Sequence, residues 1–199
     1  KTIYETLKKK ARAVIQDDTV SFANKLVEIL RLHQICNGFL KMDKGEIYVF
    51  KNNPKLKELL RILEEADGKC IIWATYVHNI ESIKQTLGDL YGKDAVVSIY
   101  GKDSVEVRKN AVENFQHNDG CQFLVGNPST GGYGLTLTAA RNVIYFSNSY
   151  NLEVRKQSED RAHRIGQKHK VTYIDIQVPN SIDTMIISSL KRKIQLSAA

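Results

Sequence analysis

Two arginines near the carboxyl end of the chain have the residue type and the spacing needed to act on a polyanion. Arg161 and Arg164 lie three residues apart within residues 157–167. On a helix predicted over residues 152–163, this spacing places both guanidinium groups on one face, where they can converge on a triphosphate. A planar, permanently charged guanidinium stabilises charge that spreads over the oxygens of a transferring phosphoryl group, the role of an arginine finger. From these residues alone, a solvated helix face of mixed charge is the alternative interpretation.

A glycine-rich loop is the second candidate for phosphate chemistry. Gly131, Gly132 and Gly134 precede a Leu-Thr-Leu-Thr run at residues 135–138. Residues without a Cβ atom let backbone N–H groups approach a phosphate, on a nucleotide or on a DNA strand, without steric cost. The alternative is an ordinary flexible loop.

Alternating strands and helices would position these groups. Apolar, β-branched runs predict buried strands at residues 70–74, 96–100, 122–125, 143–146 and 171–178. Helical spacing predicts helices at residues 54–66, 78–87, 104–115, 152–163 and 181–194. This alternation implies right-handed crossovers, so the predicted fold class is α/β, with three layers and a mostly parallel central sheet. In such sheets, functional residues lie in the loops at the carboxyl ends of the strands, which here are the loops after Ala74, Tyr100, Val125 and Phe146.

The first part of the chain has a different pattern. Apolar residues at helical spacing over residues 3–37 predict two helices, with a break near Asp17 and Asp18 and a stop at Gly38. After a short extended piece at residues 46–50, Asn53 and a proline begin the next helix. We therefore expect a helical appendage over residues 1–45 that bridges two lobes, and an α/β lobe over residues 46–199.

Net charge, cysteine content and the length of apolar runs limit the class of protein. A net charge of +7 and a pI near 9.2 favour a polyanionic partner such as nucleic acid, with a solvated basic surface as the alternative. The three cysteines, Cys36, Cys70 and Cys121, form no C-x-x-C pair, so we expect a reduced, intracellular chain without a metal site. No apolar run is long enough to cross a bilayer and no signal peptide pattern is present, which predicts a cytoplasmic protein without a membrane partner.

Several segments together resemble a known family. Residues 157–167 are similar to the last motif of Swi/Snf-type helicases of superfamily two, Q-x-x-x-R-x-H-R-I-G-Q. Residues 34–37 (Gln-Ile-Cys-Asn) resemble the block that precedes the C-terminal lobe of that family, and residues 69–87 resemble the first strand and helix of the lobe. Residues 101–115 are similar to its G-S-x-x-x-R region, and residues 131–138 to its G-G-x-G-L-N-L-T motif. The sequence around residues 150–153 and 173–175 is most similar to that of bacterial and phage members.

The resemblance implies a RecA-like lobe and a set of site residues. Arg161 and Arg164 would reach across to ATP held by an N-terminal RecA-like lobe, and Gln157 would sense the γ-phosphate region. Gly132 and Gly134 would also lie at the nucleotide. The implied contacts to duplex DNA come from Lys102, Ser129, Thr130, Gly131, Gly132 and Thr136.

The sequence departs from the family pattern in the DNA-contacting segments. The family commonly has Asp-Gly-Ser where residues 100–104 read Tyr-Gly-Lys-Asp-Ser, so the family's Asp is missing at that position and Lys102 can touch a phosphate instead. A lysine often precedes the glycines, whereas Ser129 and Thr130 offer hydroxyl groups without charge. Thr136 replaces an asparagine.

Two elements of a complete motor are absent from the sequence. No G-x-x-x-x-G-K-[ST] phosphate loop occurs, and no Asp-Glu pair follows a strand in the position that would hold magnesium. We expect ATP and Mg²⁺ to bind only in a complete two-lobe enzyme, so that this chain alone binds neither and is inactive. Two alternatives remain open: a passive nucleic-acid or protein-docking module without an ATPase role, and an RNA helicase lobe.

Overall fold

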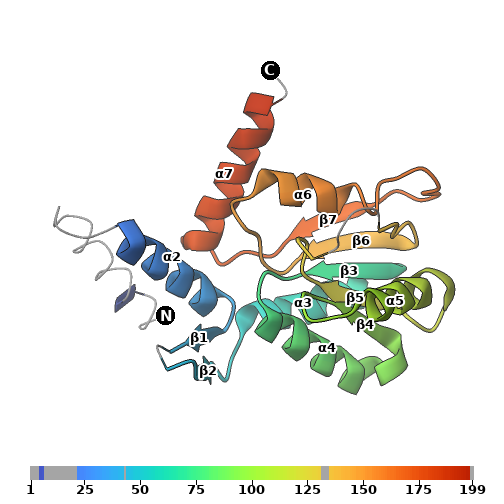
Figure 1. Ribbon diagram of the computed structural model, residues 1–199, viewed down its shortest axis with the longest axis horizontal. Helices are drawn as coiled ribbons and strands as arrows, with labels where there is room; N and C mark the ends of the chain where they lie inside the picture. Colours follow the sequence, from blue (N-terminus) through green and yellow to red (C-terminus); the bar gives the residue numbers. More distant parts are fainter. Residues whose placement is uncertain (1–4, 7–21, 43, 131–134, 198–199) are drawn as a thin grey trace.

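Strands and helices alternate along most of the chain. The structure is a computed structural model that describes residues 5–6, 22–42, 44–130 and 135–197 (Figure 1). The main strands are β3 (Lys69–Trp73), β4 (Val96–Ile99), β5 (Phe123–Gly126), β6 (Ala140–Tyr145) and β7 (Thr172–Asp175). The main helices are α2 (Phe22–Cys36), α3 (Pro54–Glu65), α4 (Val77–Tyr91), α5 (Val105–His117), α6 (Leu152–Glu159) and α7 (Ile182–Ser197), with a short 3-10 helix, η1, at Lys93–Ala95.

The main strands form one parallel sheet. Its strand order is β4-β5-β3-β6-β7, and each neighbouring pair is parallel. The predicted mostly parallel sheet is confirmed. Because parallel strands end at the same edge, the loops after β3, β4, β5 and β6 share one edge of the sheet.

Helices cover both faces of the sheet, which confirms the predicted three layers. Along β3, Cys70 and Ile72 point into the core under α3 and α4, whereas Ile71 and Trp73 point into the core under α5. This alternation follows from the two-residue period of a strand. In Figure 1, α4 lies below the sheet and α6 above it.

The predicted boundaries hold for most elements. Asn53 caps α3 by accepting hydrogen bonds from the backbone of Lys55 and Leu56, and proline follows it as expected. Gly38 adopts φ of +86° just after α2, a conformation that ends a helix and favours glycine. β7 is shorter than predicted and ends at Asp175, because the Val178 N–H donates to the Asp183 carboxylate and so belongs to the connection to α7.

The N-terminal part packs against the end of the chain. Leu32 and Cys36 of α2 share an apolar cluster with Ile182, Ile186 and Leu190 of α7. The extended piece predicted at residues 46–50 forms β2 (Ile47–Val49), which pairs antiparallel with β1 (Phe39–Lys41). The break predicted at Asp17 and Asp18 lies outside the described residues.

A buried polar cluster joins this part to the lobe. The Lys55 ammonium contacts the Asp183 carboxylate at 2.9 Å and the Asn37 side chain at 3.0 Å. Asn37 accepts a further hydrogen bond at its carbonyl from Asn79 of α4. His33 donates or accepts at the Tyr76 hydroxyl, 2.9 Å away. The cluster therefore connects α2, α3, α4 and the start of α7.

Burial makes His33 a source of pH-dependent stability. Burial lowers the pKa of His33 to about 4; the Asp183 charge opposes this shift, and the Lys55 charge adds to it. The unfolded chain takes up a proton near pH 6.5 and the folded chain only near pH 4, so the free energy of unfolding decreases as pH falls through this window.

We expect the wild type to lose about 2 kcal/mol more stability than His33→Gln between pH 7 and pH 5. Urea unfolding at the two pH values measures the difference. His117→Gln is the control, because His117 is exposed on α5, and it should follow the wild type. Equal losses for His33→Gln and the wild type would contradict the assignment.

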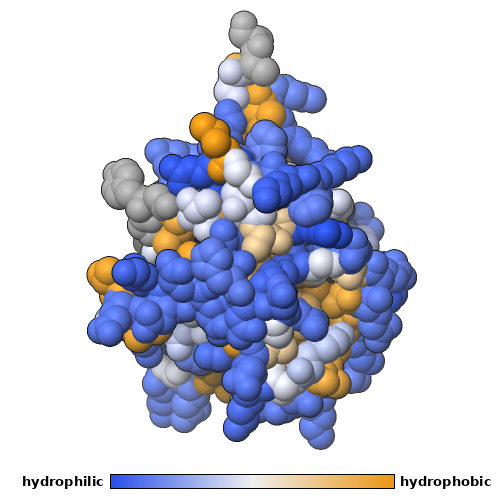
Figure 2. All heavy atoms as spheres, turned by 90° about the vertical axis from the view of Figure 1, so that its right-hand side faces the viewer, coloured by the Kyte–Doolittle hydropathy of each residue, from blue (hydrophilic) through white to orange (hydrophobic). Residues whose placement is uncertain are grey.

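The surface is mainly polar on the side turned to the viewer in Figure 2. Hydrophilic residues cover most of that face, and hydrophobic residues form small, separate patches. Across the described residues, no helix combines the length and apolar character that crossing a membrane requires.

Candidate functional site

Polar side chains tie the loops together at the carboxyl edge of the sheet. The Ser147 hydroxyl, after β6, accepts a hydrogen bond of 2.8 Å from the backbone of Thr75, after β3. The Asn127 amide, after β5, donates to the Thr75 carbonyl at 2.9 Å. Three loops at the predicted edge are thus held in a fixed relation, although sequence analysis assigned none of these residues a role. Their position directly after buried strands is the signal that could have found them.

Arg108 fixes the loops that carry most of the predicted DNA contacts. Its guanidinium donates to the Asp103 carbonyl at 2.8 and 3.1 Å and to the Thr130 carbonyl at 3.3 Å. Ser104 caps α5 by accepting from the Val107 N–H. The family-like G-S-x-x-x-R region therefore has a local structural task, which is to join the loop after β4 to the loop after β5.

The predicted DNA contacts on these loops are accessible to different degrees. Lys102 and Ser129 are exposed, whereas Thr130 is half-buried. Ser129 donates through its backbone N–H and its hydroxyl to the Asn127 side chain, at 2.9 and 2.5 Å. Gly131, Gly132 and Gly134 lie outside the described residues.

The prediction that Arg161 and Arg164 share a helix is wrong. Helix α6 ends at Glu159, and both arginines lie in the turns that follow. The helical hydrogen-bond pattern stops because the Arg161 carbonyl accepts from the Leu137 N–H at 2.9 Å. The Ala162 and His163 N–H groups both donate to the Glu159 carbonyl. The two guanidinium groups are therefore placed by tertiary contacts and not by helical periodicity.

Arg161 is buried against the sheet. Only 8% of the residue is exposed, and its guanidinium lies 5.5 Å from the centre of the Trp73 ring. Burial lowers the pKa of Arg161, and the neighbouring Tyr145 acts in the opposite direction. Trp73 is fully buried, which confirms its predicted place in the core.

Arg164 is exposed beside the segment that follows the glycine loop. Its Nη1 donates to the Thr136 hydroxyl at 3.2 Å, so the structure brings together two residues predicted for neighbouring parts of the site. Gln167 fixes the base of this turn, because its amide donates to the carbonyls of Ala140 and Ala162 at 3.1 and 3.0 Å. Arg164 is therefore presented to solvent from a braced turn.

Gln157 lies on the exposed face of α6. Its amide donates to the Glu153 carboxylate, one turn earlier, at 3.1 Å. On the opposite side of the helix, the Arg155 guanidinium lies over the Tyr145 ring at 3.5 Å and pairs with Asp175 of β7. Arg155 and Asp175 could not be found from the sequence, because a pair separated by twenty residues carries no local signal.

Other residues near this edge pack into the fold. Tyr76 occupies the capping position of α4 without a side-chain bond, and the ring of His78, in the first turn, lies 4.8 Å from that of Phe39. Cys70 and Cys121 are buried, as expected for small apolar residues. Burial raises the pKa of both thiols, so packing and not reactivity explains them.

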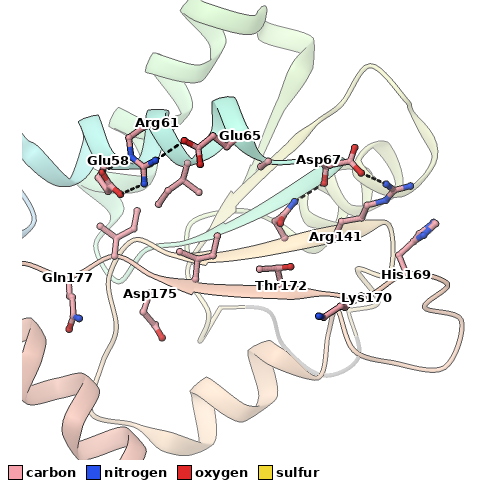
Figure 3. Close-up of a pocket in the computed structure, with 15 residues that line it drawn as sticks. Glu58, Arg61, Glu65, Asp67, Arg141, His169, Lys170, Thr172, Asp175 and Gln177 are labelled. Atoms are coloured by element: carbon pink, nitrogen blue, oxygen red, sulfur yellow. Dashed lines mark hydrogen bonds and ion pairs between the residues drawn. The ribbon is translucent and has the colours of Figure 1, made fainter.

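A polar groove lies elsewhere, between α3 and β7 (Figure 3). Its walls carry paired charges: Arg61 with Glu58 and Glu65, and Arg141 with Asp67. None of the predicted site residues lines it. The Asp175 side chain points away from α3, toward the side on which α6 lies (Figure 3). The groove is therefore separate from residues 160–167, the segment after α6 that carries Arg161 and Arg164 and is called the arginine segment below.

The parallel sheet, the covered faces and the braced loops at one edge define an α/β domain of the RecA-like class. Residues 51–166 match the model of the family described as "Helicase conserved C-terminal domain". This chain belongs to that family, in its Snf2-like branch of superfamily two.

Known proteins similar to this chain are much longer. The ATP-dependent helicase fft2 of Schizosaccharomyces pombe is 29% identical over 96% of this chain and 16% of its own length. An uncharacterized ATP-dependent helicase of Mycoplasma pneumoniae is 31% identical over 92% of this chain and 17% of its own length. The chain thus spans about a sixth of the length of these curated relatives.

A solved structure supports the same assignment. The Sulfolobus solfataricus SWI2/SNF2 ATPase core in complex with dsDNA superimposes with a TM-score of 0.75 and 25% identity. The match covers 97% of this chain and 42% of that one. The fold described above is therefore that of part of a Snf2-like ATPase core.

Proposed function

We propose that this chain is the C-terminal lobe of an ATP-dependent, Snf2-like DNA translocase. The observation that carries the proposal is the braced turn that presents Arg164 beside Thr136. A permanently charged, exposed guanidinium held in place is suited to meet phosphate oxygens on a neighbouring domain. The proposal is also supported by the relation to ATP-dependent helicases and to an ATPase core solved with duplex DNA.

In this proposal, the two arginines and Gln157 complete an ATP site that another lobe begins. Arg164 acts as the finger that contacts the transferring phosphoryl group. Arg161, buried against Trp73, contributes a second guanidinium to the same site. Gln157 contacts the γ-phosphate region, and Gly132 and Gly134 approach the nucleotide. ATP and Mg²⁺ are held mainly by the N-terminal RecA-like lobe, so the isolated chain binds neither and does not hydrolyse ATP.

Duplex DNA is proposed to lie along the loops braced by Arg108. Lys102 supplies a charge, Ser129, Thr130 and Thr136 supply hydroxyl groups, and Gly131 and Gly132 supply backbone N–H groups. Phosphate contacts of this kind carry little sequence information, so we expect a strong dependence of affinity on salt and little sequence preference.

We also propose a division of the chain into two parts. Residues 1–45 form a helical appendage that bridges the lobes, and residues 46–199 form the RecA-like lobe. The buried contact of Lys55 with Asn37 and the apolar cluster that α2 shares with α7 support a fixed connection of α2 to the lobe. A cytoplasmic location in a bacterium or in a phage-infected cell stays a prediction, because the similar proteins come from fission yeast as well as from bacteria.

The function is tested by ATP hydrolysis in the intact protein. Under the proposal, duplex DNA stimulates hydrolysis and RNA does not, while the isolated 199-residue chain is inactive. Equal stimulation by RNA would favour an RNA helicase. An intact protein without hydrolysis under any condition would favour the passive docking module.

Lys102→Ala should weaken DNA binding in a specific way. Loss of one phosphate contact lowers the slope of log affinity against log salt concentration by about one unit. Fluorescence anisotropy with a labelled duplex at several salt concentrations measures this slope. Lys84→Ala is the control, because this exposed lysine belongs to α4 and not to the proposed track. Equal changes in both variants would remove Lys102 from the interface.

A further inference from the structure

Arg155 of α6 bonds three side chains. Its guanidinium donates to the Asp175 carboxylate at 2.5 Å, to the Asn148 side chain at 2.8 Å and, through Nε, to the Glu159 carboxylate at 2.6 Å. Asp175 ends β7, Asn148 follows β6, and Glu159 is the last residue of α6. One side chain thus joins the helix to two neighbouring strand ends.

The Arg155 contacts are sheltered from water. The side chain is only 11% exposed and Asp175 is 28% exposed, while the guanidinium stacks on the Tyr145 ring at 3.5 Å. A multiply bonded arginine in such surroundings has its orientation fixed, unlike an exposed surface ion pair. Burial acts to lower the pKa of Arg155, but the hydrogen bonds and charges of Asp175, Tyr145 and Glu159 together outweigh it, and the pKa is raised.

Two tyrosines hold the same end of α6. The Tyr145 hydroxyl is 2.7 Å from the Ser158 hydroxyl, and the Tyr173 hydroxyl donates to the Glu159 carbonyl at 3.1 Å. The chain leaves the helix at this carbonyl and reaches Arg161 two residues later. The position of α6 on β6 and β7 therefore sets where the arginine segment starts.

We propose that Arg155, with Asp175 and Asn148, is a positioning residue that aims the arginine segment at the neighbouring lobe. We call this set the α6 clasp. The inference rests on the proposed function, because it requires that Arg164 act on a nucleotide. A shift of about 1 Å in a group that meets a reacting phosphate is sufficient to cost about 100-fold. Arg155 itself touches no substrate and acts through Arg164.

The clasp is tested by a double-mutant cycle in the intact two-lobe protein with duplex DNA. The readout is the ratio of affinities for ADP with aluminium fluoride and for ADP alone, which remains measurable when hydrolysis is lost. Arg155→Ala should lower this ratio about 10- to 100-fold in the wild type. In an Arg164→Ala background it should lower the ratio no further, because both substitutions remove the same interaction.

Conservative and matched variants distinguish positioning from folding. Arg155→Lys keeps a charge for Asp175 and should restore part of the ratio, and Asp175→Asn should resemble Arg155→Ala. Lys156→Ala, on the exposed side of α6, should leave the ratio unchanged. Thermal unfolding shows whether each variant is folded. If Arg155→Ala does not fold, Asp175→Asn replaces it in the double-mutant cycle.

The outcomes separate the clasp from the function on which it rests. An unchanged affinity ratio in Arg164→Ala would overturn the proposed function. A lowered ratio in Arg164→Ala, together with an equal effect of Arg155→Ala in both backgrounds, would overturn the clasp alone. An unchanged ratio in Arg155→Ala or Asp175→Asn would also overturn the clasp.

Discussion

Arg164→Ala in the intact protein should reduce DNA-stimulated ATP hydrolysis about 1,000-fold in kcat. The guanidinium meets charge that develops on the transferring phosphoryl group, so its removal raises the barrier more than it weakens ATP binding. Because Arg164 is exposed, the substitution leaves the core intact. Steady-state kinetics with saturating duplex DNA measures kcat and KM separately.

Arg61→Ala is the matched control for Arg164→Ala. Arg61 is also an exposed arginine, but it lies on α3, where it pairs with Glu58 and Glu65. Its removal should leave kcat within about twofold, because exposed ion pairs contribute little to stability. Arg164→Lys should recover only part of the rate, because an ammonium lacks the planar fork of donors. Full activity of Arg164→Ala would rule out the finger.

Asp183→Asn should be the most damaging substitution for folding. It removes the charge that neutralises the Lys55 ammonium, and both side chains are nearly inaccessible, at 2% and 4% exposure. Breaking a buried ion pair by removing one partner costs about 3–5 kcal/mol, because the other charge stays buried. Urea unfolding at pH 7 measures this loss.

Asp67→Asn is the control for Asp183→Asn. Asp67 also pairs with a cation, Arg141, but its side chain is 88% exposed. Its loss should change stability by less than about 1 kcal/mol. Replacing Lys55 and Asp183 together with apolar residues should cost less than Asp183→Asn alone, since no charge is left buried. Equal small effects of Asp67→Asn and Asp183→Asn would show that the buried pair does not stabilise the fold.

Most of the sheet could be predicted from sequence because β3, β4, β5 and β6 are largely buried on both faces, whereas β7 at the edge is only partly buried. Runs such as Cys70–Ile71–Ile72–Trp73 are apolar throughout, and the polar turns between them are distinct. The start of α3 was predictable because Asn53 and the following proline are local signals. The end of α6 was not predictable, because the Leu137 N–H that donates to the Arg161 carbonyl comes from a distant segment.

The candidate site could be predicted only in part. The motif resemblance pointed to Arg161, Arg164 and Thr136, and the structure brings the last two together. The supporting contacts join residues far apart in the chain, such as Lys55 with Asp183, 128 residues later. Such pairs depend on the completed fold, so neither composition nor spacing indicates them.

A structure of the intact protein with duplex DNA, ADP and aluminium fluoride would test the central claim most directly. The quantity to measure is the distance from the Arg164 guanidinium to the nearest oxygen or fluorine of the bound analogue. The account predicts a hydrogen-bond distance of about 3 Å, with the guanidinium supplied across the gap between the lobes. A closed, nucleotide-bound enzyme in which Arg164 still bonds Thr136 and points to solvent would contradict it.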